Sequence, residues 1–174
     1  MPVDVPPADE LDPPGDPESV ARTICLRLLE SQARTRAELE AALRKKGVPD
    51  DAGQRVLDRF TEVGLIDDGA LADGYAQAQQ ERGLASRAVA QKLRRRGVDE
   101  ATIGQAVSTI DRSSEYAAAQ HLVARKLPSL RGLDPPVQAR RLVGMLCRRG
   151  YGMGLAHEVV RTAIDGVDLL TDGE

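Results

Sequence analysis

The sequence predicts an all-α protein made of three tandem three-helix repeats, and three observations support this fold class. First, a leucine, three mostly basic residues and a glycine recur, ending at Gly47, Gly97 and Gly150, which are 50 and 53 residues apart. A spacing of this size is typical of repeat proteins, whose units bury their apolar faces partly against each other. Second, the chain has 3 Tyr, 1 Phe and no Trp, so aliphatic residues must build the core, and among them Ala and Leu are the best helix formers. Third, no segment shows the sustained alternation of apolar and polar residues that indicates a strand.

The two ends of the chain differ in composition from the rest. Residues 1–20 hold six acids, six of the ten prolines and no Lys or Arg, and residues 165–174 hold four further acids. Because few apolar groups offset the entropy of ordering, we expect residues 1–18 to form a disordered acidic Pro-rich tail and residues 166–174 an acidic C-terminal tail. Outside the ten acids of these two ends, 24 basic side chains face 17 acidic ones, so the body carries +7 although the whole chain carries −3. The overall charge therefore does not argue against a polyanionic partner.

Between the tails we expect repeat one over residues 19–67, repeat two over 68–111 and repeat three over 112–165. The first helix of each repeat is predicted from a polar cap residue followed by apolar residues at helical spacing. The expected caps are Ser19, Asp67 or Asp68, and Ser113 or Ser114. The expected inward faces are Val20, Ile24 and Leu28, then Leu71, Tyr75 and Ala78, then Tyr116, Ala119 and Leu122 or Val123.

The second helices have clearer start and stop signals. Thr35 and Glu38 have the spacing of a capping box, Ser86 can cap the next of these helices, and Asp134 precedes Pro135 at a first helical position. A glycine follows each of the three helices, as is common where a helix stops in the left-handed conformation. The expected inward pairs are Leu39 and Leu43, Val89 and Leu93, and Leu142 and Leu146. The third helices should turn inward Val56, Leu57 and Phe60, then Ile103, Val107 and Ile110, then Leu155, Val159 and Ala163.

Basic side chains gather on the second helices, and they have two interpretations. Lys and Arg in a last helical turn interact favourably with the helix dipole, so each cluster alone is compatible with an ordinary helix end. Three clusters on equivalent helices of stacked repeats would instead form a basic stripe that follows phosphates or an acidic protein groove. The candidate binding residues are Arg44, Lys45, Lys46, Arg87, Lys92, Arg94, Arg95, Arg96, Arg140, Arg141, Arg148 and Arg149.

A helix–glycine–helix pair also fits a DNA-reading helix-turn-helix, in which the second helix enters the major groove. Here the helices over 49–60 and 99–110 begin with acids and hold few Arg or Asn side chains. Acids at that point would repel phosphates. Any contact with nucleic acid should therefore be electrostatic and independent of base sequence.

Signals for an enzyme, a metal site or a membrane protein are weak. The chain lacks a phosphate-binding loop, and His121 and His157 stand alone on predicted helices without a partner at metal-ligand spacing. Cys25 and Cys147 are expected to be free thiols that fill core positions. We expect no catalytic residues, no metal and no cofactor. No segment approaches the length of a membrane span, and no secretory signal is present, so a cytoplasmic location is expected.

One stretch carries a more specific signal. Phe60 to Ala72 reads FTEVGLIDDGALA, with the LRKKGV phrase about a dozen residues before it and LRRRGV about 25 after it. This arrangement resembles the RecX family of bacterial recombination regulators, and the resemblance covers about residues 19–165. The family pattern falls on Gly47, Phe60, Gly64, Asp67, Asp68 and Gly97, which look like positions that determine the fold. Repeat three departs from the pattern, because Gly-Met-Gly follows Tyr151 where an acidic cap would stand.

The resemblance implies an elongated, curved array of three-helix repeats without catalytic activity. It implies a protein that binds the RecA–DNA filament and inhibits RecA ATPase, strand exchange and coprotease activities by limiting filament growth or promoting disassembly. Homologous recombination, DNA repair and the SOS response would be its setting. A second hypothesis is a module that binds single- or double-stranded DNA without sequence preference and competes with RecA for it. A third is a helical scaffold for another protein. A monomer is expected in each case.

Overall fold

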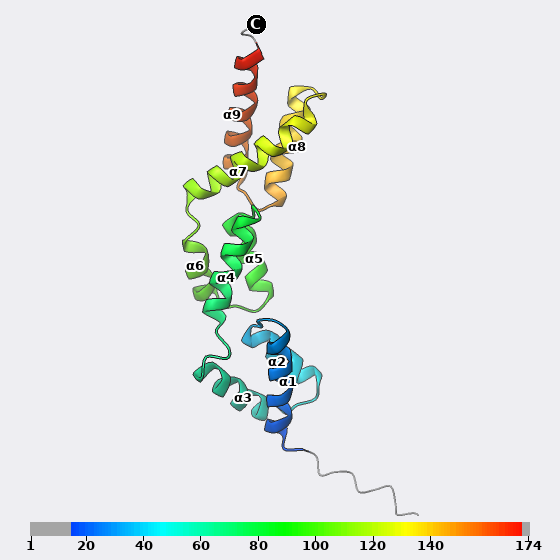
Figure 1. Cartoon of the computed structure of the whole chain (residues 1–174), viewed down its shortest axis with the longest axis vertical. Coiled ribbons are helices and arrows are strands. Elements are labelled where there is room, and N and C mark those ends of the chain that lie inside the picture. The colour runs from blue at the N-terminus through cyan, green and yellow to red at the C-terminus, as the bar shows by residue number, and fades with distance from the viewer. Residues whose placement is uncertain (1–14, 172–174) are drawn as a thin grey trace, which may run out of the picture. The chain divides into compact units, whose positions relative to one another are not determined.

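The computed structural model describes residues 15–171, with side chains described as far as Gly166. The expected disorder of residues 1–14 and 172–174 therefore concerns segments outside the described residues. Over the described range the chain forms nine α-helices, one short 3-10 helix and no strand (Figure 1). The elements are α1 Pro17–Ser31, α2 Arg36–Lys45, α3 Asp50–Glu62, α4 Asp68–Glu81, α5 Ser86–Arg95, α6 Glu100–Ser108, α7 Arg112–Lys126, η1 Leu127–Leu130, α8 Pro135–Arg148 and α9 Met153–Thr171.

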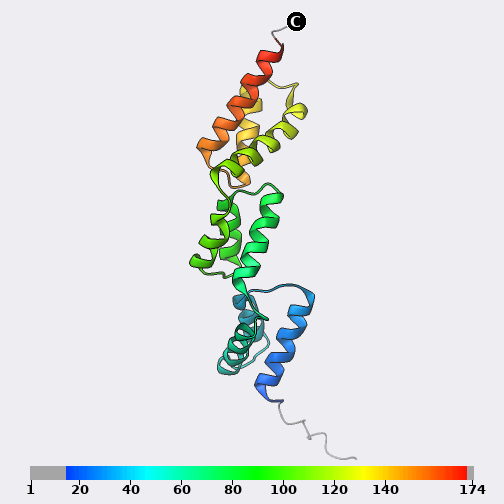
Figure 2. The same cartoon turned by 60° about the vertical axis from the view of Figure 1, so that its left-hand side comes forward.

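The helices form three groups of three, and each group has its own core. The chain divides into two compact units. Unit 1, residues 1–68, holds α1–α3, and unit 2, residues 69–174, holds the rest of the helices. Within unit 2, α4, α5 and α6 bury a common set of side chains and lie side by side in both views (Figure 2). The core around α7, η1, α8 and α9 also includes Ala85, which directly precedes α5. The second and third repeats therefore share buried surface, and the all-α fold of three tandem repeats is confirmed.

The inward faces predicted for the second and third helices are largely confirmed. The three leucine and valine pairs of α2, α5 and α8 are at most 2 % exposed. Val56, Leu57, Phe60, Ile103, Ile110 and Val159 are buried as well. Val107, Leu155 and Ala163 are half-buried at the edges of their cores.

The prediction for the first helices of repeats one and two was partly confirmed. Ile24 and Leu28 are half-buried against the core of repeat one, and Tyr75 is half-buried against that of repeat two, but each helix is rotated by about one residue from the expected face. Val20 is 42 % exposed, whereas Ala21 and Cys25 are fully buried. In α4 the buried residues include Ala72 and Ala76, while Leu71, Tyr75 and Ala78 are half-buried. Small side chains let a helix approach its neighbours closely, so the larger apolar residues lie at the flanks of the contact. In α7 the expectation holds better, since Ala119 and Val123 are buried.

The expected caps of α1 and α7 were wrong for one physical reason. The Ser19 amide donates to the Asp16 carboxylate at 3.2 Å, and the Ser114 amide donates to that of Asp111 at 2.7 Å. In each helix an aspartate three residues earlier takes the cap position, so the helix begins earlier and the serine lies in its first turn. Helix α1 consequently starts at Pro17, two residues before the expected boundary.

The other starts were partly as expected. Thr35 and Glu38 form the predicted capping box, and Asp67 directly precedes α4. Ser86 is the first helical residue of α5, so it does not cap that helix. Asp134 holds the cap position of α8, but its side chain accepts no helix amide. The first two helical residues are prolines without an amide hydrogen, and the Val137 amide donates to the Asp134 backbone carbonyl at 2.8 Å.

The helix ends carry two further findings. Gly47, Gly97 and Gly150 have φ of 76°, 79° and 92°, which confirms the predicted left-handed stops. Helix α9 continues to Thr171, into the segment predicted to be a C-terminal tail. That segment has no proline, so its backbone contains nothing that must end a helix.

Candidate binding surface

The basic cluster at the end of α2 is partly used inside the fold. Arg44 Nη2 lies 3.0 Å from Glu40 Oε1, and Arg44 Nε lies 3.4 Å from Asp50 Oδ1. Lys45 and Lys46 are exposed, and the described residues offer neither of them a carboxylate partner. Within this cluster the unpaired positive charge therefore comes from the two lysines.

The three arginines after Leu93 meet three different environments. Arg94 forms a two-pronged ion pair with Glu100, in which Nη2 lies 2.8 Å from Oε2. The Arg96 guanidinium lies over the ring of Tyr75, 5.6 Å from its centroid. Arg95 is exposed, and no partner for it exists among the described residues. Arg87 and Lys92, on the same helix, are exposed in the same way.

The third cluster divides similarly. Arg149 is half-buried and donates from Nη1 to the carbonyl of Arg82 at 2.8 Å, while its own carbonyl accepts the Ala85 amide at 3.0 Å. Arg149 thus fastens repeat three to repeat two. Arg140, Arg141 and Arg148 are exposed. A β-carbon at Gly144 would lie 3.3 Å from Arg148 Nη1, so the Arg148 side chain folds back along α8.

The candidate set therefore separates into two kinds of residue. Arg44, Arg94, Arg96 and Arg149 have partners within the fold. The remaining eight are exposed and have no such partner in the described part of the chain: Lys45, Lys46, Arg87, Lys92, Arg95, Arg140, Arg141 and Arg148. Whether these eight bind a partner stays a prediction.

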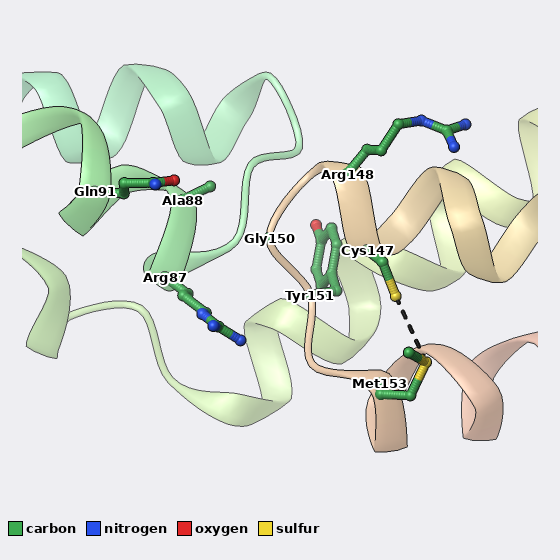
Figure 3. A pocket seen from close by; sticks show the side chains of 8 residues that line it. All are labelled: Arg87, Ala88, Gln91, Cys147, Arg148, Gly150, Tyr151 and Met153. Carbon is green, nitrogen blue, oxygen red and sulfur yellow. Dashed lines mark hydrogen bonds between the residues drawn. The ribbon is translucent and has the colours of Figure 1, made fainter.

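Sequence reasoning missed a pocket of about 370 Å³ in unit 2, where repeats two and three meet. One side consists of Arg87, Ala88 and Gln91 from α5, and the other of Cys147, Arg148, Gly150, Tyr151 and Met153 (Figure 3). Gly150 fits because a β-carbon there would lie 2.5 Å from the β-carbon of Ala88. The one sequence signal was the Gly-Met-Gly segment, which departs from the acidic starts of the other third helices.

The histidines and cysteines are placed as follows. His121 and His157 are exposed. Cys25 is fully buried, as expected, and burial raises the pKa of its thiol to about 11. Cys147 is only half-buried and lies at the edge of the core instead of inside it. Across the described residues no group of three or more His, Cys, Asp or Glu side chains could hold a metal ion. No helix there is long and apolar enough to span a bilayer.

Comparison with known families assigns all three repeats. Residues 21–60 match the first three-helix domain of RecX, residues 67–107 the second and residues 113–160 the third. The chain belongs to the RecX family. The regulatory protein RecX of Streptomyces coelicolor is 50 % identical over 159 residues, which cover 91 % of this chain and 85 % of that protein. The RecX of Thermobifida fusca is 46 % identical over 160 residues, 91 % of this chain and 86 % of the other.

A solved RecX structure has the same fold. The crystal structure of RecX from Lactobacillus salivarius matches with a TM-score of 0.76, covering 88 % of this chain and 98 % of that one, at 19 % identity. The RecX relatives are named as regulatory proteins. The family resemblance noted from Phe60 to Ala72 is thereby confirmed.

Proposed function

We propose that this RecX-family chain is a non-enzymatic regulator of the RecA recombinase. It binds the RecA–DNA filament and lowers RecA ATPase, strand exchange and coprotease activities by limiting filament growth or promoting disassembly. The observation that carries this proposal is family membership across all three repeats, with relatives named regulatory protein RecX. In this proposal the chain acts as a monomer in the cytoplasm.

The exposed basic residues are consistent with a partner that presents a negatively charged surface. Eight of the twelve candidate cations are not neutralised by the described residues, so their charge is available to phosphates or to acidic protein groups. This observation also favours the second candidate function, sequence-independent binding of single-stranded DNA in competition with RecA. Stoichiometry separates the two functions.

The test is RecA ATPase on single-stranded DNA with this protein added below one copy per RecA. Filament regulation predicts strong inhibition at that ratio, because one blocked filament end stops the growth of many subunits. Inhibition that appears only when the protein saturates the DNA would instead support competition for the strand. In that case binding to bare DNA should also weaken steeply as salt rises. No inhibition at either ratio would contradict both functions.

A further inference from the structure

The pocket between repeats two and three has two different walls, one with a charged side chain and one with apolar side chains. Arg87 reaches from α5 toward the side formed by Cys147 and Met153, whereas Arg148 extends along α8, away from Tyr151 (Figure 3). Met153 is 62 % exposed, and its sulfur lies 3.9 Å from that of Cys147. No carboxylate lines this pocket, and Arg87 has no ion-pair partner among the described residues. An exposed guanidinium thus faces an exposed thioether across an open space.

A nucleic acid would use only half of this pocket. Proteins that hold single strands stack the bases on exposed aromatic faces. Tyr151 is the aromatic residue that lines this pocket, and it is 3 % exposed, with its hydroxyl 3.3 Å from the carbonyl of Gly83. Its ring is therefore part of the core and is closed to a base. A phosphate could meet Arg87 but would gain nothing from Met153.

A protein segment with an acidic residue beside an apolar one matches both walls. A carboxylate accepts two parallel hydrogen bonds from an arginine fork, and the partly enclosed position strengthens them. Methionine is flexible and polarisable, so it adapts to apolar side chains of different shapes at binding surfaces. The positive charge of the body adds a longer-range attraction for such a segment.

We propose that this pocket is a docking site for a segment of a partner protein in which Asp or Glu stands beside an apolar residue. The carboxylate pairs with Arg87, and the apolar side chain contacts Met153 and the Cys147 side of the pocket. That the segment belongs to RecA rests on the proposed function, whereas the chemistry of the pocket does not depend on it.

The chain contains its own reporter for this pocket. Cys147 lines it and is half-buried, so alkylation of this thiol should slow when the pocket is filled. Cys25, the other cysteine, is fully buried, and its raised pKa keeps the thiol protonated and unreactive. The rate of Cys147 alkylation by iodoacetamide, followed by mass spectrometry, therefore measures pocket occupancy in the full-length protein.

The first experiment uses a synthetic peptide of alternating glutamate and leucine, the same peptide with glutamine for glutamate, and oligo(dT). The glutamate peptide should protect Cys147, and Arg87→Ala or Met153→Ser should weaken this protection by roughly tenfold. The matched control is Arg125→Ala, which removes an exposed arginine of α7 outside the pocket and should change nothing. Circular dichroism checks that each variant keeps its helices.

Three results would overturn the proposal. The first is equal protection by the glutamine peptide or by oligo(dT), and the second is no protection by the glutamate peptide at millimolar concentration. The third is faster alkylation after residues 1–14 are removed, which would make the chain's own acidic segment the occupant.

The second experiment repeats the alkylation with RecA filaments on single-stranded DNA. Protection by filaments, lost in Arg87→Ala, is expected. If the peptide protects but filaments neither bind nor protect, the docking site stands and the proposed function fails. If filaments are inhibited while neither they nor the peptide protect Cys147, the docking site fails and the proposed function stands.

Discussion

Arg94, Arg95 and Arg96 are consecutive residues, but they differ in what they contact. Successive residues of a helix point about 100° apart, so three neighbours cannot share one face. Arg94 points toward Glu100 at the start of α6, and Arg96 toward the Tyr75 ring in α4, which leaves Arg95 to solvent. The three charges look equivalent in the sequence, whereas in the fold two of them have partners and one is exposed.

Single substitutions in this cluster should affect either partner binding or stability, depending on the arginine that is changed. Arg95→Ala should weaken binding to RecA filaments or DNA and leave the melting temperature unchanged, because Arg95 has no partner in the described chain. Arg96→Ala should lower the free energy of unfolding by about 0.5–1 kcal/mol through loss of the stacking on Tyr75. Thermal melts and a filament-binding assay measure both effects. A stability loss in Arg95→Ala equal to that in Arg96→Ala would contradict this division.

At the scale of helices, α2 and α5 begin in the same way. The amide of the first residue of α2, Arg36, donates to Asp68 Oδ1 at 2.9 Å. The amide of the first residue of α5, Ser86, donates to Glu115 Oε1 of α7 at 2.7 Å. In both cases the carboxylate comes from the first helix of the following repeat. This arrangement gives Asp68, in the Asp-Asp pair of the family motif, a structural role.

The third repeat differs at this point. Its second helix, α8, begins with Pro135 and Pro136, which have no amide hydrogen to donate. In α2 and α5 the first amide donates to a carboxylate of the following repeat. In α8 the prolines remove the amide hydrogens that would need such an acceptor. The first two residues of α8 therefore need no carboxylate acceptor.

Neutralising Glu115, the carboxylate that accepts the first amide of α5, should destabilise unit 2. Glu115→Gln replaces a charged acceptor by a weaker neutral one, and we expect a loss of about 1 kcal/mol in the free energy of unfolding. Glu81→Gln, which changes an exposed carboxylate at the end of α4, serves as the control and should have little effect. Urea titrations followed by circular dichroism compare the two variants. Equal stability of Glu115→Gln and the parent would show that the cap contributes nothing.

At the scale of the whole molecule, the second and third repeats are one unit. The Ala85 amide bonds the Arg149 carbonyl, Tyr151 bonds the Gly83 carbonyl, and Gly150 packs on Ala88. Burial, followed by the nearby charge of Glu115, raises the pKa of Tyr151, so its hydroxyl stays protonated and donates at neutral pH. These contacts close the pocket walls and hold them in a fixed relation.

A fragment of residues 69–174 should accordingly fold and unfold in a single transition. Tyr151→Phe should lower its free energy of unfolding by about 1 kcal/mol, the usual contribution of one hydrogen bond, without splitting the transition. Thermal unfolding followed by calorimetry and circular dichroism measures both. Two separate transitions in the unsubstituted fragment would mean that repeats two and three fold independently.

Much of this protein follows from local sequence signals. Helical periodicity, the Thr35–Glu38 capping box and the glycine stops depend on residues within one or two turns of each other, so they can be read without coordinates. The spacing of Gly47, Gly97 and Gly150 gave the three repeats for the same reason. The basic candidates could be named as well, since charge is a property of composition.

Tertiary structure decided what depends on distant residues. Whether Arg94, Arg96 and Arg149 are free depends on Glu100, Tyr75 and Arg82, which the fold brings beside them. The rotation of α1 and α4 depends on how closely neighbouring helices approach. Small residues permit a close approach, but their presence in the sequence does not predict it. The pocket exists because Gly150 lets repeat three approach Ala88 of α5, and no local pattern links positions 62 residues apart in the chain. Local signals set the elements, and contacts between elements set which charges and surfaces remain for a partner.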